Sequence, residues 1–385
     1  MLVMEKGNFT INKKKIFFKK ISKKKIKIHS YPVDYEIIFD KSFSQLKSKI
    51  KLQKSYFILD KNIYEKYINI FTKLKKKNLL VIEAKENTKT EKSVKRILNF
   101  FVQNNISKSN IIYCLGGGII QDLSGFACCI YKRGIPWIYY PTTLLGMTDS
   151  CVGGKVGVNF KKYKNLIALF SAPKQVIVNL TFLNSLKEEE IISGLGESLR
   201  LHITGGPYFL KQFDKNIDKY FKNYGGISEL IYNSLLVKKA VVEKDEYELD
   251  IRRAMNFGHS FGHALEYLSK NKISHGLCVT IGMCIEMIVG YEKKIIKDWK
   301  LVQKILDRSL LLLKNKKINN ILKNTKISKI NDVLKKDKKT LNNKIILAIP
   351  YQLGKIGFFP LKLNSKSTAL FEKAKKKLII CINEK

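Results

Sequence analysis

The sequence is poor in proline, in arginine and in long apolar runs, and each shortage excludes something. Its 385 residues include only 7 Pro, too few for a proline-rich linker between domains. The longest apolar run of the second half, residues 277–290, contains Glu286 and is too short to span a bilayer. No apolar segment followed by a small-residue cleavage site lies near the N-terminus, so we expect no secretory signal and a cytoplasmic location.

The 7 cysteines lack the spacing of a disulfide framework. Most of them stand in apolar surroundings, as in IIYCLGG and IGMCIEM. We therefore expect buried, reduced thiols in a cytoplasmic protein, and neither disulfides nor a cysteine metal site.

Arginine is scarce although the net charge is +40, because only 6 of the 72 basic residues are Arg. Base-edge readout and bidentate phosphate contacts favour arginine, whereas the lysines here are spread along every segment. This composition argues against nucleic-acid binding as the main function, but it should attract anionic substrates. The densest basic run, residues 12–28, predicts a solvated extension over residues 1–30, with at most a weak contact to RNA or a membrane surface.

The first half of the chain alternates apolar strand patterns with helical ones, which predicts a parallel α/β sheet of the Rossmann-like kind. The expected strands are residues 55–60, 78–84, 110–115, 136–140 and 175–180, and the expected helices are 90–105 and one from about residue 119. After about residue 185 the pattern becomes helical. We therefore expect an α/β domain over residues 31–184 and an all-helical domain over residues 185–385.

Two glycine-rich segments predict ligand contacts. Gly116, Gly117 and Gly118 lie between a predicted strand and a helix, where the backbone can approach an anion such as a pyrophosphate. The full G-x-G-x-x-G pattern is absent, so an ordinary tight turn is the alternative. Asp122, one helical turn later, could accept a hydrogen bond from a ligand hydroxyl. Residues 139–165 are irregular, polar and rich in glycine, which is typical of a binding segment.

Three of the 5 histidines, His259, His263 and His275, lie within residues 256–276. A metal site, an acid–base pair and a packed helix face could each account for this cluster. His259 and His263 are four residues apart, the usual spacing of two metal ligands on one helix face. A zinc-protease motif would require Glu at position 260, where this chain has Ser.

The motifs together resemble those of 3-dehydroquinate synthases, over roughly residues 30–360. The matching segments occur in the family's order and spacing: GGGIIQDLSGF, RGIPWIYYPTTLL, TDSCVGGKVGVN, GLGES, KKAVVEKDE, RRAMNFGHSFGHALE, HG and KKDKKTLNNKIILAIP. The resemblance implies an NAD-binding α/β domain, a helical metal- and substrate-binding domain and a homodimer. It also implies the cyclisation of 3-deoxy-D-arabino-heptulosonate 7-phosphate to 3-dehydroquinate with loss of phosphate. In this reaction NAD is consumed and regenerated, and a divalent metal, zinc or cobalt, is required.

The resemblance carries roles onto individual positions. Glu197, His259 and His275 match the family's metal ligands, and His263 matches its acid–base histidine on the phosphate side. Other positions that match catalytic or substrate-facing residues are Asp149, Lys155, Asn165, Arg200, Lys238, Arg252, Asn256 and either Lys338 or Lys339. Positions that match NAD-binding residues are Asp60, Asn62, Glu86, Lys89, Gly116, Gly117, Gly118, Asp122, Thr142, Thr143, Asp149, Lys155, Lys164, Ser185 and Glu190. Arg133 matches an arginine that the family offers to the substrate of the neighbouring subunit.

Three other functions stay open at this point. Arg200 stands where the family has Lys, which is compatible with a sugar phosphate cyclase acting on another substrate, such as sedoheptulose 7-phosphate. An iron-type alcohol dehydrogenase would share the architecture, but would accumulate NADH with product. A non-enzymatic RNA-binding protein would bind nucleic acid in a salt-sensitive way and release no phosphate.

Overall fold

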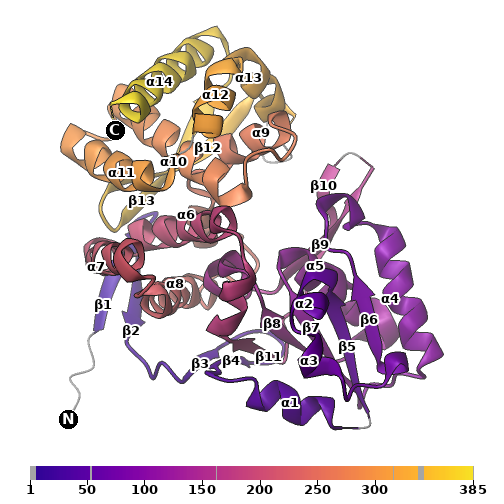
Figure 1. The fold of residues 1–385 in the computed structure, drawn as a ribbon. Coiled ribbons are helices and arrows are strands. Elements are labelled where there is room, and N and C mark those ends of the chain that lie inside the picture. Colours follow the sequence, from indigo (N-terminus) through magenta and orange to yellow (C-terminus); the bar gives the residue numbers. More distant parts are fainter. Residues whose placement is uncertain (1–5, 53, 162, 315, 337–341, 385) are drawn as a thin grey trace. The chain divides into compact units, whose positions relative to one another are not determined.

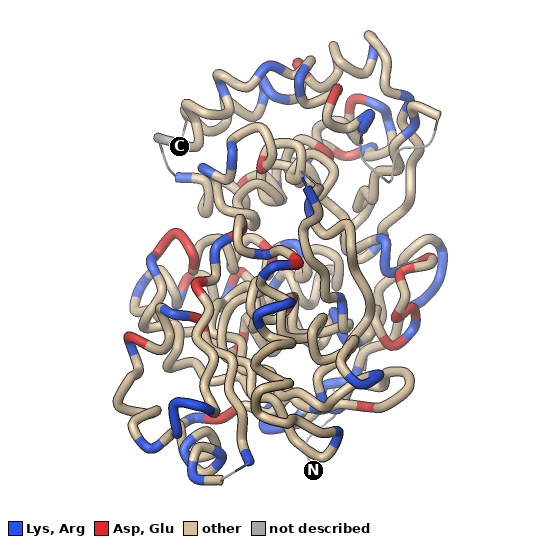
Figure 2. Tube along the Cα trace, turned by 90° about the vertical axis from the view of Figure 1, so that its right-hand side faces the viewer, with Lys and Arg blue, Asp and Glu red and all other residues tan. Residues whose placement is uncertain are grey.

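The protein is described by a computed structural model, in which residues 6–52, 54–161, 163–314, 316–336 and 342–384 are placed (Figure 1). The chain forms two compact units. The α/β unit is Ile21–Lys187, and the helical unit combines residues up to Lys20 with Glu188–Lys385. Lys and Arg residues occur along the whole described trace, whereas Asp and Glu residues are fewer (Figure 2).

The α/β unit is built on a seven-stranded sheet with the order β3-β4-β11-β8-β7-β5-β6. Its strands are β3 (Lys25–Ile28), β4 (Tyr35–Phe39), β5 (Ser55–Asp60), β6 (Leu79–Ile82), β7 (Ile111–Gly116), β8 (Trp137–Pro141) and β11 (Gln175–Val178). All neighbours pair in parallel except β3, which pairs antiparallel to β4 at the edge. Every residue of β8 is buried, as expected for a parallel sheet that is covered on both faces.

Helices and one hairpin complete this unit. The helices are α1 (Ser44–Ile50), α2 (Lys61–Lys66), α3 (Ile68–Phe71), α4 (Glu91–Gln103) and α5 (Gly118–Ile130), and the hairpin is β9 (Lys155–Phe160) with β10 (Tyr163–Phe170). The chain leaves β5 toward β6 on one side and leaves β7 toward β8 on the other. In such sheets ligands bind outside the carboxyl ends of the strands, at the point where the strand order reverses. That point lies here between β5 and β7.

The helical unit consists of nine α-helices and a small sheet among the residues that the structure describes. The helices are α6 (Glu188–Gly205), α7 (Pro207–Asn223), α8 (Ile227–Val242), α9 (His259–Leu268), α10 (His275–Glu292), α11 (Trp299–Leu312), α12 (Lys316–Asn324), α13 (Ile327–Lys335) and α14 (Ser365–Asn383). The sheet, in the order β12-β13-β1-β2, contains β12 (Lys344–Gln352), β13 (Lys355–Lys362), β1 (Lys6–Ile11) and β2 (Lys14–Lys19). α10 is the central helix, buried from Gly276 to Gly290.

The predicted fold class is confirmed, and the predicted strands of the α/β sheet agree with the observed ones within a few residues. Two expectations are wrong in part. Residues 1–30 are not simply a solvated extension, because β1 and β2 form a hairpin and β3 joins the large sheet. The second unit is not all-helical, because it contains the four-stranded sheet. The hairpin folds onto this unit by burying Phe9, Ile11, Ile16 and Phe18, which alternate with more exposed residues.

The thiols agree with the expectation from sequence. All 7 cysteines are free of disulfides; 5 are buried, and Cys129 and Cys381 are half-buried. Within the described part of the chain, every helix is too short or too polar to cross a membrane.

His202, on α6, should make the helical unit sensitive to acid. The imidazole is fully buried, and burial lowers its pKa to about 4. Its Nδ1 lies 2.7 Å from the Ser198 carbonyl oxygen, while Nε2 has no hydrogen-bond partner. The unfolded chain binds this proton near pH 6.5, so the stability contributed by His202 is present above that pH and is lost as pH falls toward 4. From this group alone we expect about 2 kcal/mol less stability at pH 5 than at pH 7.

The measurement is urea unfolding at pH 5 and pH 7, followed by Trp299 fluorescence in a Trp137→Phe background. Trp299 then reports on the helical unit alone, because the chain has only 2 Trp. His202→Gln should reduce the difference between the two pH values, and His29→Gln, at an exposed position, should not. An unchanged difference in His202→Gln would contradict the prediction.

Candidate active site

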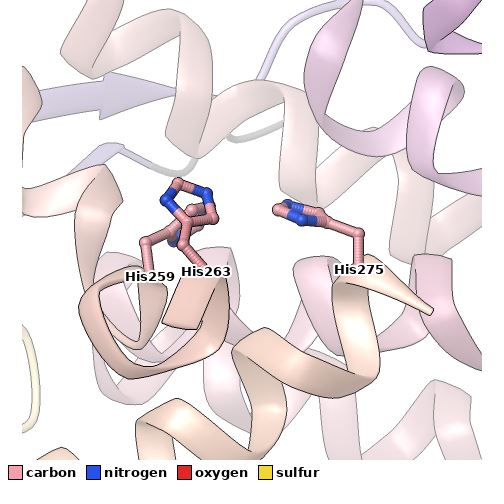
Figure 3. Close-up of side chains that lie close together, drawn as sticks. All are labelled: His259, His263 and His275. Atoms are coloured by element: carbon pink, nitrogen blue, oxygen red, sulfur yellow. The ribbon is translucent and has the colours of Figure 1, made fainter. Parts of the chain in front are cut away.

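The histidine cluster lies in the helical unit and is built by two adjacent helices. His259 begins α9, His263 follows one turn later, and His275 begins α10. The three imidazoles point toward one another (Figure 3). Their ring centroids are 5.2 to 5.6 Å apart, and one nitrogen of each lies within 4.8 Å of the others. This arrangement suits a shared ion and differs from a merely packed helix face.

Glycines bring the helices close enough for this cluster to form. A Cβ added to Gly276 would lie 1.9 Å from the Ser193 carbonyl oxygen on α6, and one added to Gly282 would lie 1.9 Å from the Gly258 carbonyl oxygen before α9. A Cβ on Gly196 would lie 2.6 Å from the Gly276 carbonyl oxygen. No side chain fits at these points. Gly196, Gly258 and Gly276 therefore allow the helix backbones to touch directly next to Glu197, His259 and His275.

Glu197 on α6 completes the cluster from the third helix. Its Oε1 lies 3.3 Å from His275 Nε2 and 3.6 Å from His259 Nε2. Ligand atoms about 2.0–2.1 Å from a tetrahedral zinc ion lie about 3.3 Å from one another. Oε1 is also buried without a hydrogen-bond partner of good geometry. The donor set and the spacing therefore fit a divalent metal held by Glu197, His259 and His275.

Contacts on the far side of each ring fix the two imidazoles. His275 Nδ1 lies 3.0 Å from Glu266 Oε2, and His259 Nδ1 lies 3.3 Å from the Phe257 carbonyl oxygen. With a proton on each Nδ1, both contacts are hydrogen bonds and both Nε2 lone pairs face Glu197. Zinc-binding histidines usually have such an outer partner, which fixes the tautomer and the ring orientation.

Arg200 keeps Glu197 ionised. Its Nε donates to Glu197 Oε2 at 2.6 Å, and both side chains are almost completely buried. Burial raises the pKa of Glu197, but the Arg200 guanidinium and the two imidazoles outweigh this effect and hold the pKa well below its usual range. Arg200 Nη1 also lies 3.6 Å from Met255 Sδ. Arg200 thus holds the Glu197 carboxylate in place and favours its charged form.

Glu266 should strengthen metal binding through His275. In Glu266→Gln an amide oxygen can still accept from Nδ1, but the charge that increases the basicity of the imidazole is lost. We expect the metal affinity to fall about tenfold or more. Competition with a chromophoric chelator would measure it. A matched control is Glu292→Gln, which removes a carboxylate that pairs with Lys373 and Lys377 at the other end of α10. Equal affinities of both variants would contradict the role of Glu266.

The predicted substrate residues Arg252 and Asn256 lie on a short 3-10 segment, Ile251–Asn256. The preceding turn is organised by Asp245, whose carboxylate accepts hydrogen bonds from the backbone N–H groups of Leu249, Asp250 and Arg252 at 2.8 to 2.9 Å. The Arg252 guanidinium donates to the Glu246 carbonyl oxygen. Lys238, also predicted, is buried on the neighbouring helix α8.

Sequence reasoning missed Glu248, which receives a 2.7 Å hydrogen bond from Asn256 Nδ2. Its backbone has a φ of 61°, a left-handed conformation that is uncommon outside glycine and often marks a functional segment. It also missed Asp245 and Glu266, which act by holding other residues. For Asp245 and Glu248 a signal was available, because the acidic run KDEYELD (244–250) stands out in a chain with few carboxylates.

In the α/β unit, the predicted cofactor residues follow the carboxyl ends of successive parallel strands. Asp60 and Asn62 follow β5, Glu86 and Lys89 follow β6, Gly116 to Gly118 follow β7, Thr142 and Thr143 follow β8, and Ser185 follows β11. This is the edge of the sheet where a dinucleotide binds in this class of fold. The structure therefore brings together most of the predicted set.

The glycine turn has room for an anion. Gly117 is the residue before α5, and that helix has no side-chain cap at its N-terminus. A Cβ on Gly118 would meet open space, whereas one on Gly117 would lie 2.9 Å from Thr143 Cγ2. Uncapped N–H groups at a helix N-terminus favour a phosphate, so the turn fits the pyrophosphate of NAD.

A polar network joins the segment after β6 to α5 and to the β9–β10 hairpin. Lys89 Nζ lies 2.5 Å from Asp122 Oδ2 and donates to Asn165 Oδ1 at 2.5 Å. Glu86 Oε1 accepts from Asn159 Nδ2 at 2.8 Å, with Lys164 Nζ at 3.9 Å. Asn159 was not among the predicted site residues. Burial raises the pKa of Asp122, and the Lys89 ammonium opposes this effect.

The remaining predicted residues lie on several different elements. Asp149 lies in a π-helical turn, Gly146–Ser150, and Lys155 is exposed at the start of β9. Arg133 is exposed and has a φ of 61°. Glu190 lies in the first turn of α6, in the helical unit. Lys338 and Lys339 lie outside the described residues.

Comparison with known proteins relates the whole chain to one group of enzymes. The family models described as 3-dehydroquinate synthase N-terminal and C-terminal match residues 79–193 and 194–340. A 3-dehydroquinate synthase of Streptococcus pyogenes serotype M49 is 34% identical over 359 residues, which cover 90% of this chain and 97% of that protein. One from Pelagibacter ubique is 33% identical over 363 residues, 91% of this chain and 98% of that protein.

The solved structures show the same fold. A 2-epi-5-epi-valiolone synthase of Streptomyces hygroscopicus with bound NAD+ and Zn2+ is similar with a TM-score of 0.77 and 19% identity, covering 91% of this chain and 98% of that one. A 2-deoxy-scyllo-inosose synthase with carbaglucose-6-phosphate, NAD+ and Co2+ has a TM-score of 0.75 and 18% identity, covering 92% and 99%.

Proposed function

Since the chain belongs to the 3-dehydroquinate synthase family, we propose that it cyclises 3-deoxy-D-arabino-heptulosonate 7-phosphate to 3-dehydroquinate and releases phosphate. The main support is the position of Glu197 Oε1, which lies close to the Nε2 atoms of His259 and His275. The Nδ1 atom of each imidazole has its own oxygen partner. When bound, NAD supplies reversible oxidation of a substrate carbon, and a zinc or cobalt ion polarises substrate oxygen atoms.

The residues around the cluster suit a substrate with a carboxylate and a phosphate. Arg252 and Lys238 are buried cations of the helical unit, and a buried cation favours an anionic partner. Asn256 can orient a hydroxyl group next to Glu248. His263 is exposed and lies 5.2 and 5.6 Å from the other two rings, where it can exchange a proton with the leaving phosphate.

In the α/β unit, the glycine turn is proposed to hold the pyrophosphate of NAD. Asp60, at the carboxyl end of β5, is proposed to hold a ribose hydroxyl, as an acid at that strand end does in related folds. Lys89 and Asp122 support the segment around the cofactor through their ion pair. Thiols that are not joined in disulfides suit a cytoplasmic enzyme, which is the location we propose.

Arg200 does not favour a second substrate. The Arg200 guanidinium is buried and contacts Glu197 and Met255. The exchange of Lys for Arg therefore affects how the proposed metal ligand Glu197 is held. This observation keeps the acid sugar as the proposed substrate ahead of sedoheptulose 7-phosphate.

The deciding experiment measures phosphate release from candidate sugar phosphates, with and without a chelator. We expect release from the acid sugar, no net NADH and loss of activity with chelator. Turnover of sedoheptulose 7-phosphate without turnover of the acid sugar would refute the proposed substrate. NADH that accumulates in step with product would indicate a dehydrogenase.

We also propose a homodimer. The β9–β10 hairpin exposes large apolar side chains: Phe160, Tyr163, Leu166, Ile167 and Phe170. A strand that is exposed along almost its whole length is typical of an interface, and a second copy is the partner that the family resemblance implies. Light scattering should give about twice the 44.4 kDa of one chain, and Leu166→Asp should reduce the mass toward a single copy.

A further inference from the structure

A second basic hollow lies at the opposite edge of the large sheet from the cofactor residues. Its volume is about 740 Å³, within the range of small-molecule sites. It is lined by residues at or just before the starts of β5 and β6, such as Lys54 and Lys77, and by residues of α4 and the loop after it, such as Arg96 and Asn104. Since these strands are parallel, their amino ends share one edge, and the cofactor residues follow the other ends.

Five cationic side chains line the hollow: Lys54, Lys75, Lys76, Lys77 and Arg96. None of the described residues that line it is Asp or Glu. By contrast, Lys373 and Lys377 share a carboxylate partner, Glu292, at the end of α10. Like charges confined to one concave surface repel one another and create a positive potential, which an anion relieves.

The rest of the lining is ordered and is suited to an organic ligand. Arg96 Nη2 donates to the Val81 carbonyl oxygen at 3.0 Å, which fixes one edge of the guanidinium. Asn78 is buried and links the starts of two strands by donating to the Ser55 carbonyl oxygen at 3.2 Å. The rings of Tyr56 and Phe100 meet edge to face at 6.3 Å and provide apolar surface between the cations.

We propose that this hollow, which we name the amino-edge pocket, binds a small organic polyanion that carries phosphate or carboxylate groups. It is distinct from the cofactor crevice, because β5 begins at the pocket and ends five residues later at Asp60, about 17 Å away. The two sites share elements: α4 begins just after Lys89 and reaches the pocket with Arg96 and Gln103. A ligand there would act on the same helix that follows the cofactor segment.

The test is a calorimetric titration of ATP and of inorganic tripolyphosphate into protein saturated with NAD at low salt. The triple variant Lys75→Gln, Lys76→Gln, Lys77→Gln should bind both probes about tenfold or more weakly, as the loss of three exposed ion pairs would give. Chelation of an active-site metal and any binding in the cofactor crevice are the same in parent and variant, so they do not contribute to the difference. An unchanged NAD affinity shows that the variant is folded.

The matched control removes the same charge from the other unit. Lys211, Lys215 and Lys219 are exposed on α7, and their triple replacement by Gln should change the affinity for either probe less than twofold. Equal weakening in both triple variants would mean that the probes respond only to the net charge of +40, and would overturn the proposal. Absence of binding to the parent protein would overturn it as well.

Discussion

Replacing His275 with alanine should remove the bound metal, whereas replacing His263 with alanine should leave the metal bound and slow the reaction. His275 Nε2 lies 3.3 Å from Glu197 Oε1 and is held from behind by Glu266. Loss of an outer partner costs 10- to 100-fold in metal affinity, so loss of the ligand itself should cost at least about 100-fold. Loss of a proton-transfer group such as His263 should reduce the rate by about 10²- to 10⁴-fold.

Metal content after dialysis and the rate of phosphate release separate the two effects. His259→Ala provides an internal control, since it should behave like His275→Ala. If His263→Ala lost metal and His275→Ala retained it, the ligands would be the two histidines four residues apart on α9, as helix spacing alone suggests.

Replacing Gly276 with alanine should also abolish metal binding, although glycine carries no ligand atom. The added Cβ would lie 1.9 Å from the Ser193 carbonyl oxygen, so α6 and α10 would have to separate. Because both partners are backbone, no side-chain rotation can relieve the clash. We expect a loss of about 1–3 kcal/mol of stability or more, as overpacking gives, together with a large fall in metal affinity.

Gly290→Ala is the matched control on the same helix. Its Cβ would meet only side-chain atoms of Ile296 and Ile349, at 3.0 and 3.1 Å, and these can shift by a few tenths of an ångström. Unfolding curves and metal titrations of both variants would measure the effects. A Gly276→Ala protein with normal metal affinity would show that the close approach of the helices is not needed for the site.

The sequence predicted the central strands of the large sheet because their apolar runs are short, continuous and bounded by turns. β5 and β7 are such cases, with every inner position except Tyr56 buried. The hairpin of β1 and β2 was missed because lysines occupy its outward positions, and the basic run hides the alternation of buried residues such as Phe9 and Phe18. The hairpin of β9 and β10 was missed because the polar stretch NFKKYKN at its centre interrupts the apolar pattern of the two strands.

The sequence predicted the candidate metal ligands, but not the residues that hold the site residues in place. Motif spacing and family resemblance predicted Glu197, His259 and His275 as metal ligands, and the structure brings these side chains together. Glu266 and Asp245 could not be found in this way, because their roles depend on which groups the fold places against them. Periodicity describes which face of a helix is buried, but it does not describe partners across helices.

The hairpin of β1 and β2 has a consequence for the order in which the protein is made. β1 pairs with β13, so Ile11 finds its partner Ile356 only after the intervening chain has been synthesised. At 5–20 residues per second this takes on the order of 20–70 seconds. The α/β unit is continuous in sequence and can fold on the ribosome during this time. Phe9, Ile11, Ile16 and Phe18 stay exposed to solvent until the rest of the helical unit has been made. The charged lysines between Ile11 and Ile16 would oppose aggregation of this exposed segment.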